Sequence, residues 1–471
     1  MQVTIEKLGN GGDGIARIAS QSKYAPEKWV LFIPNSAPQD QLEITLTERK
    51  KNYGRGVIHK VIRESSQRAI PPCPYYFTPQ KKIWCGGCNF QHLKLVSQLE
   101  EKKKLLIEAL TKIGSFNSIS VLPPIGSVTP EQNYRFRNKI QIPFGKEAGR
   151  VISGFYAPGT HTIVPIEDCL IQSIPLMRIV QFITQKMNDW KLEVYSQTKQ
   201  KGWLRHLYIR EGADGEHLIT FVTAHAMFPR KEDWVREILK RFSSIKGICQ
   251  NIQPDHSNVI LGKEWKTHYG QDYLIETLKG LGPNHSELKL KVSAPSFFQV
   301  HLKMTVQLYE TVKKFFLEEP HVHLTVLDLH CGVGGMALTL APHSKRVIGV
   351  DEVPTAILNA QENSQINSIS NSEFYCEDAA QFLKKCLEHP TLDPSLTTVI
   401  LDPPRAGCSP QLIERLQELR PAKIIYVSCE PTTLARDLKM LTANGYKVKK
   451  VQPLDLFPQS SHIESVTLLT V

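Results

Sequence analysis

The C-terminal part of the chain alternates β-rich runs with helical stretches, and this alternation limits the possible folds more than any other feature. Five such runs lie at 326–329, 347–350, 374–376, 399–401 and 424–427, and the first four have little polar content. Apolar strands separated by helices are typical of a parallel sheet that helices cover on both faces. Two further runs, at 446–451 and 462–469, have no helix between them. They should form a hairpin that closes the sheet.

Chemically useful residues stand where these predicted strands end. A glycine-rich loop with His330, Gly332 and Gly335 follows the first strand, and Asp351 ends the second about twenty residues later. Such a loop lets the backbone approach a cofactor, and a carboxylate at that spacing can accept hydrogen bonds from ribose hydroxyls. Asp378 follows the third strand and could hold an adenine edge. The pattern resembles the S-adenosylmethionine site of a Rossmann-like methyltransferase, with another nucleotide-type ligand as the alternative.

The fourth and fifth strands end at Asp402-Pro403-Pro404-Arg405 and at Cys429. The two prolines stiffen the loop into a wall beside the cofactor's methyl group, but the loop alone does not identify the acceptor atom. A cysteine at a strand end is usually just buried. Its place at the active edge of this sheet favours a nucleophile instead. Methylation of a pyrimidine carbon requires one, because C5 of uracil is barely nucleophilic until a thiolate adds to C6. Glu464 would then be the base that removes the C5 proton; the alternative is an exposed hairpin carboxylate.

The first 64 residues contain only short β-rich runs separated by turn signals, which is typical of a small barrel. Residues 49–63 carry six basic side chains, Arg55 among them, and no acidic one. They suit RNA, although a solvated edge strand is the alternative. The segment 8–17 and Phe32-Ile33-Pro34 resemble a TRAM domain, a small OB-like barrel attached to RNA-modifying enzymes.

Residues 65–290 are predicted to form an α+β central domain. A Pro- and Cys-rich loop is followed by a helix at about 93–113, which we expect to pack on the catalytic domain, and then by mixed strands and helices. Arg135 and Arg137 lie in a run that interleaves cations and aromatics, which suits phosphates and unstacked bases. A surface strand with solvated charges is the alternative. We interpret this domain as a platform that holds RNA, and residues 291–471 as the catalytic domain.

The motifs together closely resemble the RNA uracil-C5 methyltransferases, which make 5-methyluridine from S-adenosylmethionine. They are Phe297-Phe298-Gln299-Val300, the Cys331 loop, Asp402 to Gly407, Val427-Ser428-Cys429, and Phe457 to Glu464. The resemblance implies Cys429 as nucleophile and Glu464 as base. It also implies a cofactor site made by Gln299, His330, Gly332, Gly335, Asp351, Asp378 and Asp402. Three departures are visible: position 330 is usually aromatic, position 335 is often Asn, and the acid at 351 is usually Glu.

Four of the ten cysteines could bind a metal centre. Cys73, Cys85, Cys88 and Cys169 include a Cys-x-x-Cys pair, and such a set can hold zinc or an iron–sulfur cluster. Spacing alone favours zinc slightly. The resemblance implies a [4Fe-4S] cluster instead, as in the ribosomal-RNA members of the family, although the gap between Cys73 and Cys85 is longer than usual. Cys408 lies too far from the proline motif to match the second cysteine of cytosine-C5 enzymes.

A net charge of +11 makes a polyanion the first candidate partner. The start of the chain lacks the order of a signal peptide, and no apolar window is long enough for a membrane span, so we expect a cytoplasmic monomer. The barrel and the four cysteines favour ribosomal over transfer RNA by analogy. The alternatives are a transfer-RNA uracil-C5 enzyme, an RNA cytosine-C5 enzyme, or a non-catalytic RNA-binding assembly factor.

Overall fold

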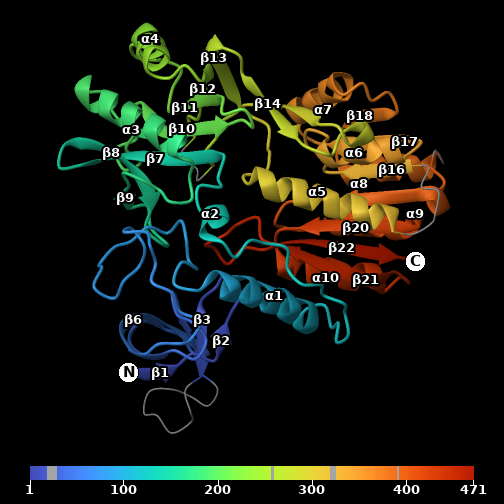
Figure 1. The fold of residues 1–471 in the computed structure, drawn as a ribbon, viewed down its shortest axis with the longest axis horizontal. Helices are drawn as coiled ribbons and strands as arrows, with labels where there is room; N and C mark the ends of the chain where they lie inside the picture. Colours follow the sequence, from blue (N-terminus) through green and yellow to red (C-terminus); the bar gives the residue numbers. More distant parts are fainter. Residues whose placement is uncertain (18–28, 256–258, 319–324, 390–391) are drawn as a thin grey trace.

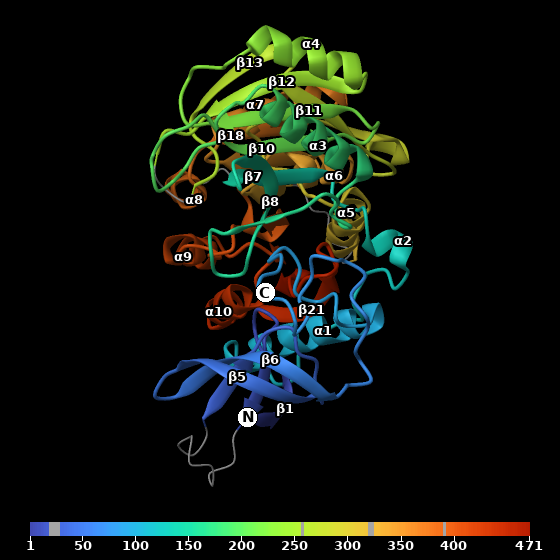
Figure 2. The same ribbon diagram turned by 90° about the vertical axis from the view of Figure 1, so that its left-hand side faces the viewer.

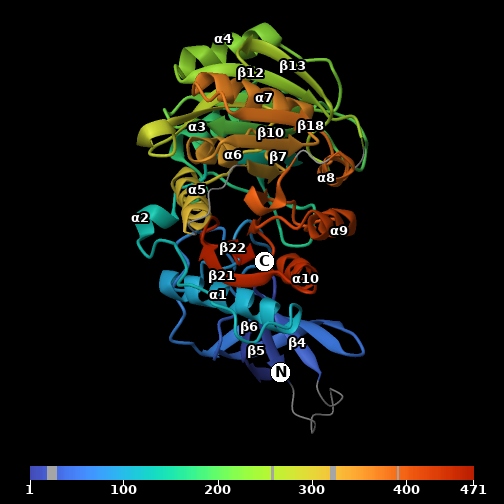
Figure 3. The same cartoon turned by 90° about the vertical axis from the view of Figure 1, so that its right-hand side faces the viewer.

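A computed structural model describes residues 1–17, 29–255, 259–318, 325–389 and 392–471 (Figure 1). Three sheets of six, seven and seven strands follow one another along the sequence, with a two-stranded hairpin between the second and the third. Side views show the N-terminal sheet at one end and the central sheet near the other, with α1, α10 and β21 between them (Figures 2 and 3). Within the described residues, no helix combines the length and apolar character that crossing a membrane requires.

The N-terminal sheet has the order β1-β5-β6-β4-β3-β2. Its strands are β1 (Gln2–Thr4), β2 (Lys7–Leu8), β3 (Gly14–Arg17), β4 (Val30–Ile33), β5 (Gln41–Arg49) and β6 (Tyr53–Arg63). Buried and exposed side chains alternate along β4 and the first half of β5, as expected for strands with one face on a core. Trp29, Leu31, Ile44 and Ile58 lie in that core. The prediction of a β-only N-terminal domain is therefore confirmed.

Helix α1 (Leu95–Lys112) joins the N-terminal sheet to the C-terminal domain. Leu106, Ala109 and Leu110 belong to the same hydrophobic core as one face of the C-terminal sheet. Lys102 is fully buried, and its Nζ donates to Asp455 Oδ1 at 2.6 Å. A buried lysine is stable only with such a partner, so this ion pair fixes the helix against the segment that leads to Glu464.

The central sheet has the order β13-β12-β11-β10-β7-β8-β9. Its strands are β7 (Lys139–Glu147), β8 (Arg150–Tyr156), β9 (Ile163–Pro165), β10 (Leu204–Glu211), β11 (His217–Thr223), β12 (Ile245–Ile252) and β13 (Glu264–Gly270). Helix α2 (Pro130–Asn133) precedes the sheet. Helices α3 (Ile174–Asp189) and α4 (Lys231–Arg241) share one core with the sheet, through residues such as Ile179 and Trp234.

A hairpin of β14 (Tyr273–Leu278) and β15 (Leu288–Ser293), with a 3₁₀ turn η1 (Pro283–His285) between its strands, leads into the C-terminal domain. Leu278, Leu290 and Val292 lie in the core of that domain. The side chain of Asn363 bonds to the backbone of Lys291. We therefore propose a domain boundary near residue 271 in place of 290.

The C-terminal sheet has the order β18-β17-β16-β19-β20-β22-β21, and the first five strands in this order are parallel. Its strands are β16 (Thr325–Leu329), β17 (Arg346–Asp351), β18 (Ser372–Cys376), β19 (Thr397–Leu401), β20 (Lys423–Ser428), β21 (Lys447–Leu454) and β22 (Glu464–Thr470). The predicted parallel α/β sheet is confirmed.

Helices cover both faces of this sheet. Helices α5 (Leu302–Leu317), α6 (Gly335–Leu340) and α7 (Pro354–Ile366) share one core with it. Helices α8 (Ala379–Glu388), α9 (Pro410–Leu419) and α10 (Pro431–Thr442) share the other core with α1. Two 3₁₀ turns, η2 (Ala341–His343) and η3 (Pro394–Leu396), lie in the connections.

The terminal hairpin reverses its order at the edge of the sheet. Strand β22 lies between β20 and β21 and is antiparallel to both. In the β20–β22 register Ser428 pairs with Ser465. Because Cys429 follows Ser428 and Glu464 precedes Ser465, the two predicted catalytic residues are brought to the same edge of the sheet.

Candidate active site and a four-cysteine cavity

The carboxyl ends of the parallel strands carry the predicted cofactor loop and acids. Backbone amides of the loop after β16 bond across to β17: His330 N and Cys331 N donate to Val350 O, and Gly332 N donates to Asp351 Oδ2 at 2.9 Å. The loop bends through the left-handed region at His330, Gly332 and Gly334, with φ of +71°, +55° and +82°. Two glycines lower the strain of such a turn, whereas His330 adopts it with a side chain.

The glycine at position 335 is explained by its neighbour on α5. A Cβ at Gly335 would lie 2.5 Å from the hydroxyl oxygen of Tyr309, which is closer than real Cβ contacts allow. Tyr309 therefore occupies the space that an asparagine side chain would need. This contact could not be predicted from the sequence, because 26 residues separate the two positions and only the packing of α5 on α6 joins them.

Three carboxyl groups lie at this end of the sheet: those of Asp328 and Glu464 are buried, and that of Asp402 is half-buried. Burial, and then Asp402 and Asp351, raise the pKa of Asp328 to about 8, against a hydrogen bond from Ala337 N. Burial raises the pKa of Asp402 to about 7. Burial, and then Asp402, also raise the pKa of Glu464 well above its usual range, with Arg405 opposing. Carboxyl groups in such a setting favour a cationic ligand, which would stabilise their charged forms.

Gln299 and Asp378 stand at the margin of this site. Gln299 is buried on the connection from β15 to α5, and its side chain makes no hydrogen bond within the described residues. Asp378 caps helix α8, where its Oδ1 accepts from Gln381 N at 2.9 Å. Helix capping is thus a structural role that Asp378 already has.

Cys429 is half-buried just beyond β20. Burial is the main cause that raises the pKa of its thiol to about 11, and Glu464 and Asp402 raise it as well, whereas Arg405 lowers it. Cys429 lines a cavity of about 150 Å³. The same Arg405 lowers the pKa of both Cys429 and Glu464, so the Asp-Pro-Pro-Arg loop supplies a cation to both predicted catalytic residues.

Helix α10 holds that loop in position. Thr433 Oγ1 donates to Arg405 O at 3.1 Å, and Arg436 Nη2 donates to Ala406 O at 2.9 Å. Cys408, which follows this loop, packs against β20 and α10. Its Sγ lies 3.5 Å from Tyr426 Oη, and its backbone N donates to Asp437 Oδ2. Cys408 is buried and is not among the residues that line the Cys429 cavity.

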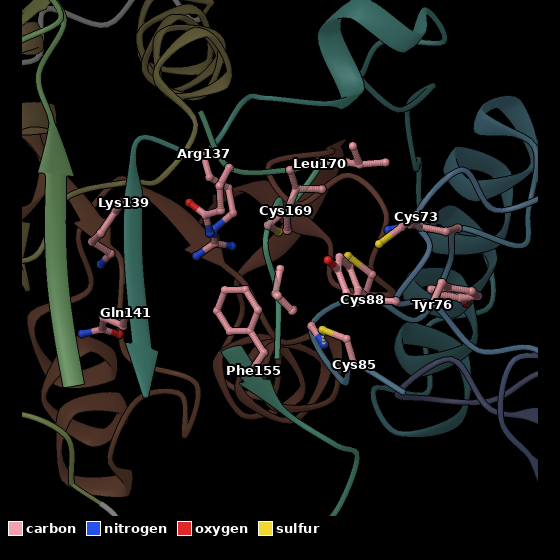
Figure 4. Close-up of a pocket in the computed structure, with 16 residues that line it drawn as sticks. Cys73, Tyr76, Cys85, Cys88, Arg137, Lys139, Gln141, Phe155, Cys169 and Leu170 are labelled. Carbon is pink, nitrogen blue, oxygen red and sulfur yellow. Dashed lines mark hydrogen bonds between the residues drawn. The ribbon is translucent and has the colours of Figure 1, made fainter. Parts of the chain in front are cut away.

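A second cavity, of about 210 Å³, is lined by Cys73, Cys85, Cys88 and Cys169 together (Figure 4). Cys73, Cys85 and Cys88 come from the loop before α1, and Cys169 follows β9. Burial and the charges of Cys169 and Cys73 raise the pKa of Cys85 to about 12, against a bond from Gly87 N. The described residues contain no group of three or more His, Cys, Asp or Glu side chains close enough for a metal ion.

Two of the three arginines expected to bind RNA lie at the four-cysteine cavity or hold a segment beside it. Arg135 Nη1 donates to Asp168 Oδ1 at 2.7 Å and to Cys169 O at 3.0 Å, so it holds the segment that carries Cys169. Arg137 is largely buried in the wall of the four-cysteine cavity. Alternation of charges and rings does not show which way a strand-edge segment turns, and RNA binding by these two arginines stays a prediction. Arg55 is exposed on β6, beside Asp13 and Glu48.

Comparisons with known proteins agree on one family. Residues 96–471 match the family described as tRNA (Uracil-5-)-methyltransferase, and residues 1–58 match the TRAM domain. An uncharacterized RNA methyltransferase of Bacillus cereus is 34% identical over 100% of the chain and 96% of its own length. One of Staphylococcus aureus is 35% identical over 99% of the chain and 97% of its own length.

A solved structure extends the likeness to the whole fold. It is the Pyrococcus abyssi tRNA (uracil-54, C5)-methyltransferase in complex with S-adenosyl-L-homocysteine. The two chains are 26% identical with a TM-score of 0.73, and the likeness covers 100% of this chain and 99% of the other. The N-terminal barrel, the central domain and the C-terminal domain thus all have counterparts in one enzyme.

Proposed function

The chain belongs to the S-adenosylmethionine-dependent RNA uracil-5-methyltransferases that carry a TRAM domain, and we propose that it methylates C5 of one uridine through a covalent bond between Cys429 and C6 of the base. The observation that carries the proposal is the β20–β22 register, which pairs Ser428 with Ser465 and so makes Cys429 and Glu464 neighbours. A nucleophile and a base at one sheet edge are the two groups that addition and elimination at a pyrimidine require.

S-adenosylmethionine supplies the methyl group when it is bound. We propose that the residues that hold it are Gln299, His330, Gly332, Gly335, Asp351, Asp378 and Asp402. Two buried atoms of this region, Asp328 Oδ1 and His330 Nδ1, have no hydrogen-bond partner within the described residues. A polar ligand would satisfy them, and the nearby carboxyl groups suit a sulfonium cation.

Cys429 and Glu464 would act at different steps on the base, the first in addition and the second in elimination. The thiolate of Cys429 adds to C6, which turns C5 into an enolate carbon that can bond to a methyl group. Glu464 then takes the C5 proton, and the electron pair of that C–H bond expels the thiolate from C6. Burial raises the pKa of Glu464, so its carboxylate binds a proton more readily than that of an exposed glutamate, which suits this role.

A base inside a stacked helix cannot reach a thiolate in the wall of a cavity, so we propose that the target uridine is flipped out or unstacked. Ribosomal RNA remains our first candidate substrate, because the four cysteines resemble the set of the ribosomal-RNA members of the family. The full-length likeness to a transfer-RNA enzyme favours transfer RNA as the second candidate, since the barrel no longer distinguishes the two. Mapping 5-methyluridine in cellular RNA with and without the protein tests both. A new 5-methylcytidine instead would contradict uracil as the target.

For the four-cysteine cavity we propose a [4Fe-4S] cluster, with zinc as the alternative. Thiols spread around a cavity of about 210 Å³ suit a polynuclear cluster better than one tetrahedral ion. Arg137 lies in the same wall, and its Nε has no hydrogen-bond partner within the described residues, so a cation is available to offset thiolate charge. An anaerobic absorption spectrum with iron and zinc analysis tests this. Stoichiometric zinc without iron would contradict the cluster.

A further inference from the structure

The cavity that contains Cys429 is not built by the catalytic domain alone. Cys429, Glu430 and Pro431 form one side of it, and Ser461, His462 and Ile463 form another; Leu105 of α1 also lines it. The remaining lining residues, Asn10 and Gly11, belong to the turn between β2 and β3 of the N-terminal barrel. A domain more than 400 residues away in sequence thus supplies part of the wall around the predicted nucleophile.

Hydrogen bonds fix the barrel turn in this position. Gly11 O accepts from Asn89 Nδ2 at 2.8 Å and from Ser461 Oγ at 3.0 Å, and Ser461 N donates to Asn89 Oδ1 at 2.8 Å. Gly12, at φ +91°, approaches so closely that a Cβ there would lie within 2.9 Å of Phe90, Ser461 and Asn89. The turn is therefore docked by specific contacts, and Asn10 is held at the cavity.

The side chain of Asn10 is free among the residues that the structure describes. Its side chain is exposed and makes no hydrogen bond within the part of the chain that the structure describes. A side-chain amide offers a donor and an acceptor side by side, which can pair with the N3–H donor and a carbonyl acceptor of uracil. The neighbouring polar groups, Gly11 O and Ser461, are already occupied by each other and by Asn89. Asn10 thus offers, on the barrel side of the cavity, a side-chain amide that is free within the described part of the chain.

We infer that Asn10 hydrogen-bonds the polar edge of the target uracil when the base enters the Cys429 cavity. The inference rests on the proposed function, because it assumes that a uracil occupies this cavity. It gives the barrel a direct part in holding the reacting base, beyond general contact with RNA. A contact made only in the reactive complex affects the rate at saturating RNA more than it affects RNA binding.

The test is single-turnover formation of the Cys429 adduct with RNA containing 5-fluorouridine, for wild type, Asn10→Ala and Asn10→Asp. Asn52→Ala, a change of an exposed asparagine in the turn between β5 and β6, is the matched control. For Asn10→Ala we expect the saturating rate to fall about 3- to 10-fold, the value of one lost neutral hydrogen bond, with RNA affinity nearly unchanged. Asn10→Asp keeps the shape of the side chain but replaces the N–H donor by an oxygen acceptor. The saturating rate of this variant should therefore fall at least as far as that of Asn10→Ala.

Each other result overturns the inference. Unchanged rates in both Asn10 variants would show that Asn10 does not touch the base. Weaker RNA binding with an unchanged saturating rate would assign Asn10 to flanking RNA. A wild-type rate in Asn10→Asp with a slow Asn10→Ala would indicate packing alone. Absence of any adduct in the wild type would contradict the proposed function as well, whereas a wild-type adduct that Asn10 variants form equally well contradicts this inference only. Alkylation of Cys429 without RNA should be the same in all variants.

Discussion

At the residue scale, the environment of Cys429 opposes the charge that its proposed role needs. Burial and two neighbouring acids raise the pKa of the thiol to about 11, and Arg405 is the cation that lowers it. At neutral pH most of the thiol is therefore protonated before ligands bind. The reaction would depend on Arg405, and on the charge of a bound cofactor, to favour the thiolate.

Arg405→Gln should raise the pKa of Cys429 further and slow its alkylation by iodoacetamide. Each pKa unit lowers the thiolate fraction about tenfold at a pH below the pKa, so we expect a several-fold slower reaction at pH 8. Arg405→Lys keeps the charge and should stay closer to wild type. Equal rates in the wild type and Arg405→Gln would show that Arg405 does not act on the thiol.

Glu464→Gln should separate addition from elimination. Without the base the C5 proton stays, the thiolate cannot leave, and the RNA remains bonded to the protein. We expect turnover to fall by at least about 100-fold, and a covalent protein–RNA band to accumulate on denaturing gels with ordinary uridine RNA and S-adenosylmethionine. Loss of turnover without that band would assign Glu464 to an earlier step.

Asp328 should make the ligand-free enzyme less stable as pH rises. Its pKa is about 8 in the folded chain and near 3.8 when exposed, so between these values the folded state binds more protons than the unfolded state. The contribution of Asp328 to the free energy of unfolding is therefore fully present below about pH 4 and is lost as the pH rises to about 8. The Tm of Asp328→Asn relative to wild type should increase over this range, whereas the exposed control Glu352→Gln should show no such trend. A constant difference would contradict the raised pKa.

At the scale of elements, α1 connects the barrel to the active site. Its buried Lys102 bonds to Asp455 and to Phe457 O, on the segment that runs from β21 to Glu464. Gln98 Nε2 donates to Gln459 Oε1 at 3.0 Å in the same region. The segment before the predicted base is thus positioned by a helix from another part of the chain.

Lys102→Ala should destabilise the protein by about 3–5 kcal/mol, because it leaves Asp455 as an unpaired buried charge. Urea unfolding measures this directly. Lys112→Ala is the matched control: Lys112 pairs with Glu108 on the same helix, and neither of these side chains is buried, so its loss should cost less than about 1 kcal/mol. Similar losses in both variants would contradict the role of the buried pair.

Sequence reasoning was sufficient for the strands of the C-terminal sheet, because apolar runs and helical stretches alternate there without ambiguity. It also predicted the terminal hairpin. It did not predict that β22 enters between β20 and β21, since hydrophobic periodicity carries no information on strand order. Most of the hairpin β14–β15 lies within the predicted central domain of residues 65–290, because hydrophobic periodicity does not reveal which core its leucines join.

At the scale of the whole molecule, the three parts meet at two cavities. The barrel turn reaches the cavity of Cys429, and the loop before α1 meets the central domain at the four cysteines. How domains dock cannot be deduced from sequence patterns, so the TRAM-like segment 8–17 did not show that Asn10 reaches the cavity of Cys429, nor did the pattern around Arg137 show that it lines the four-cysteine cavity. The cytoplasmic location and the monomeric state stay predictions.

The covalent bond between Cys429 and the target base is the central claim, and intact-mass analysis after incubation with 5-fluorouridine RNA and S-adenosylmethionine tests it most directly. Fluorine at C5 blocks the elimination step, so the wild-type enzyme should gain the mass of the RNA and one methyl group, with the modification on the peptide that contains Cys429. Cys429→Ala should gain neither. An adduct that still forms in Cys429→Ala, or that maps to another cysteine, would contradict the account.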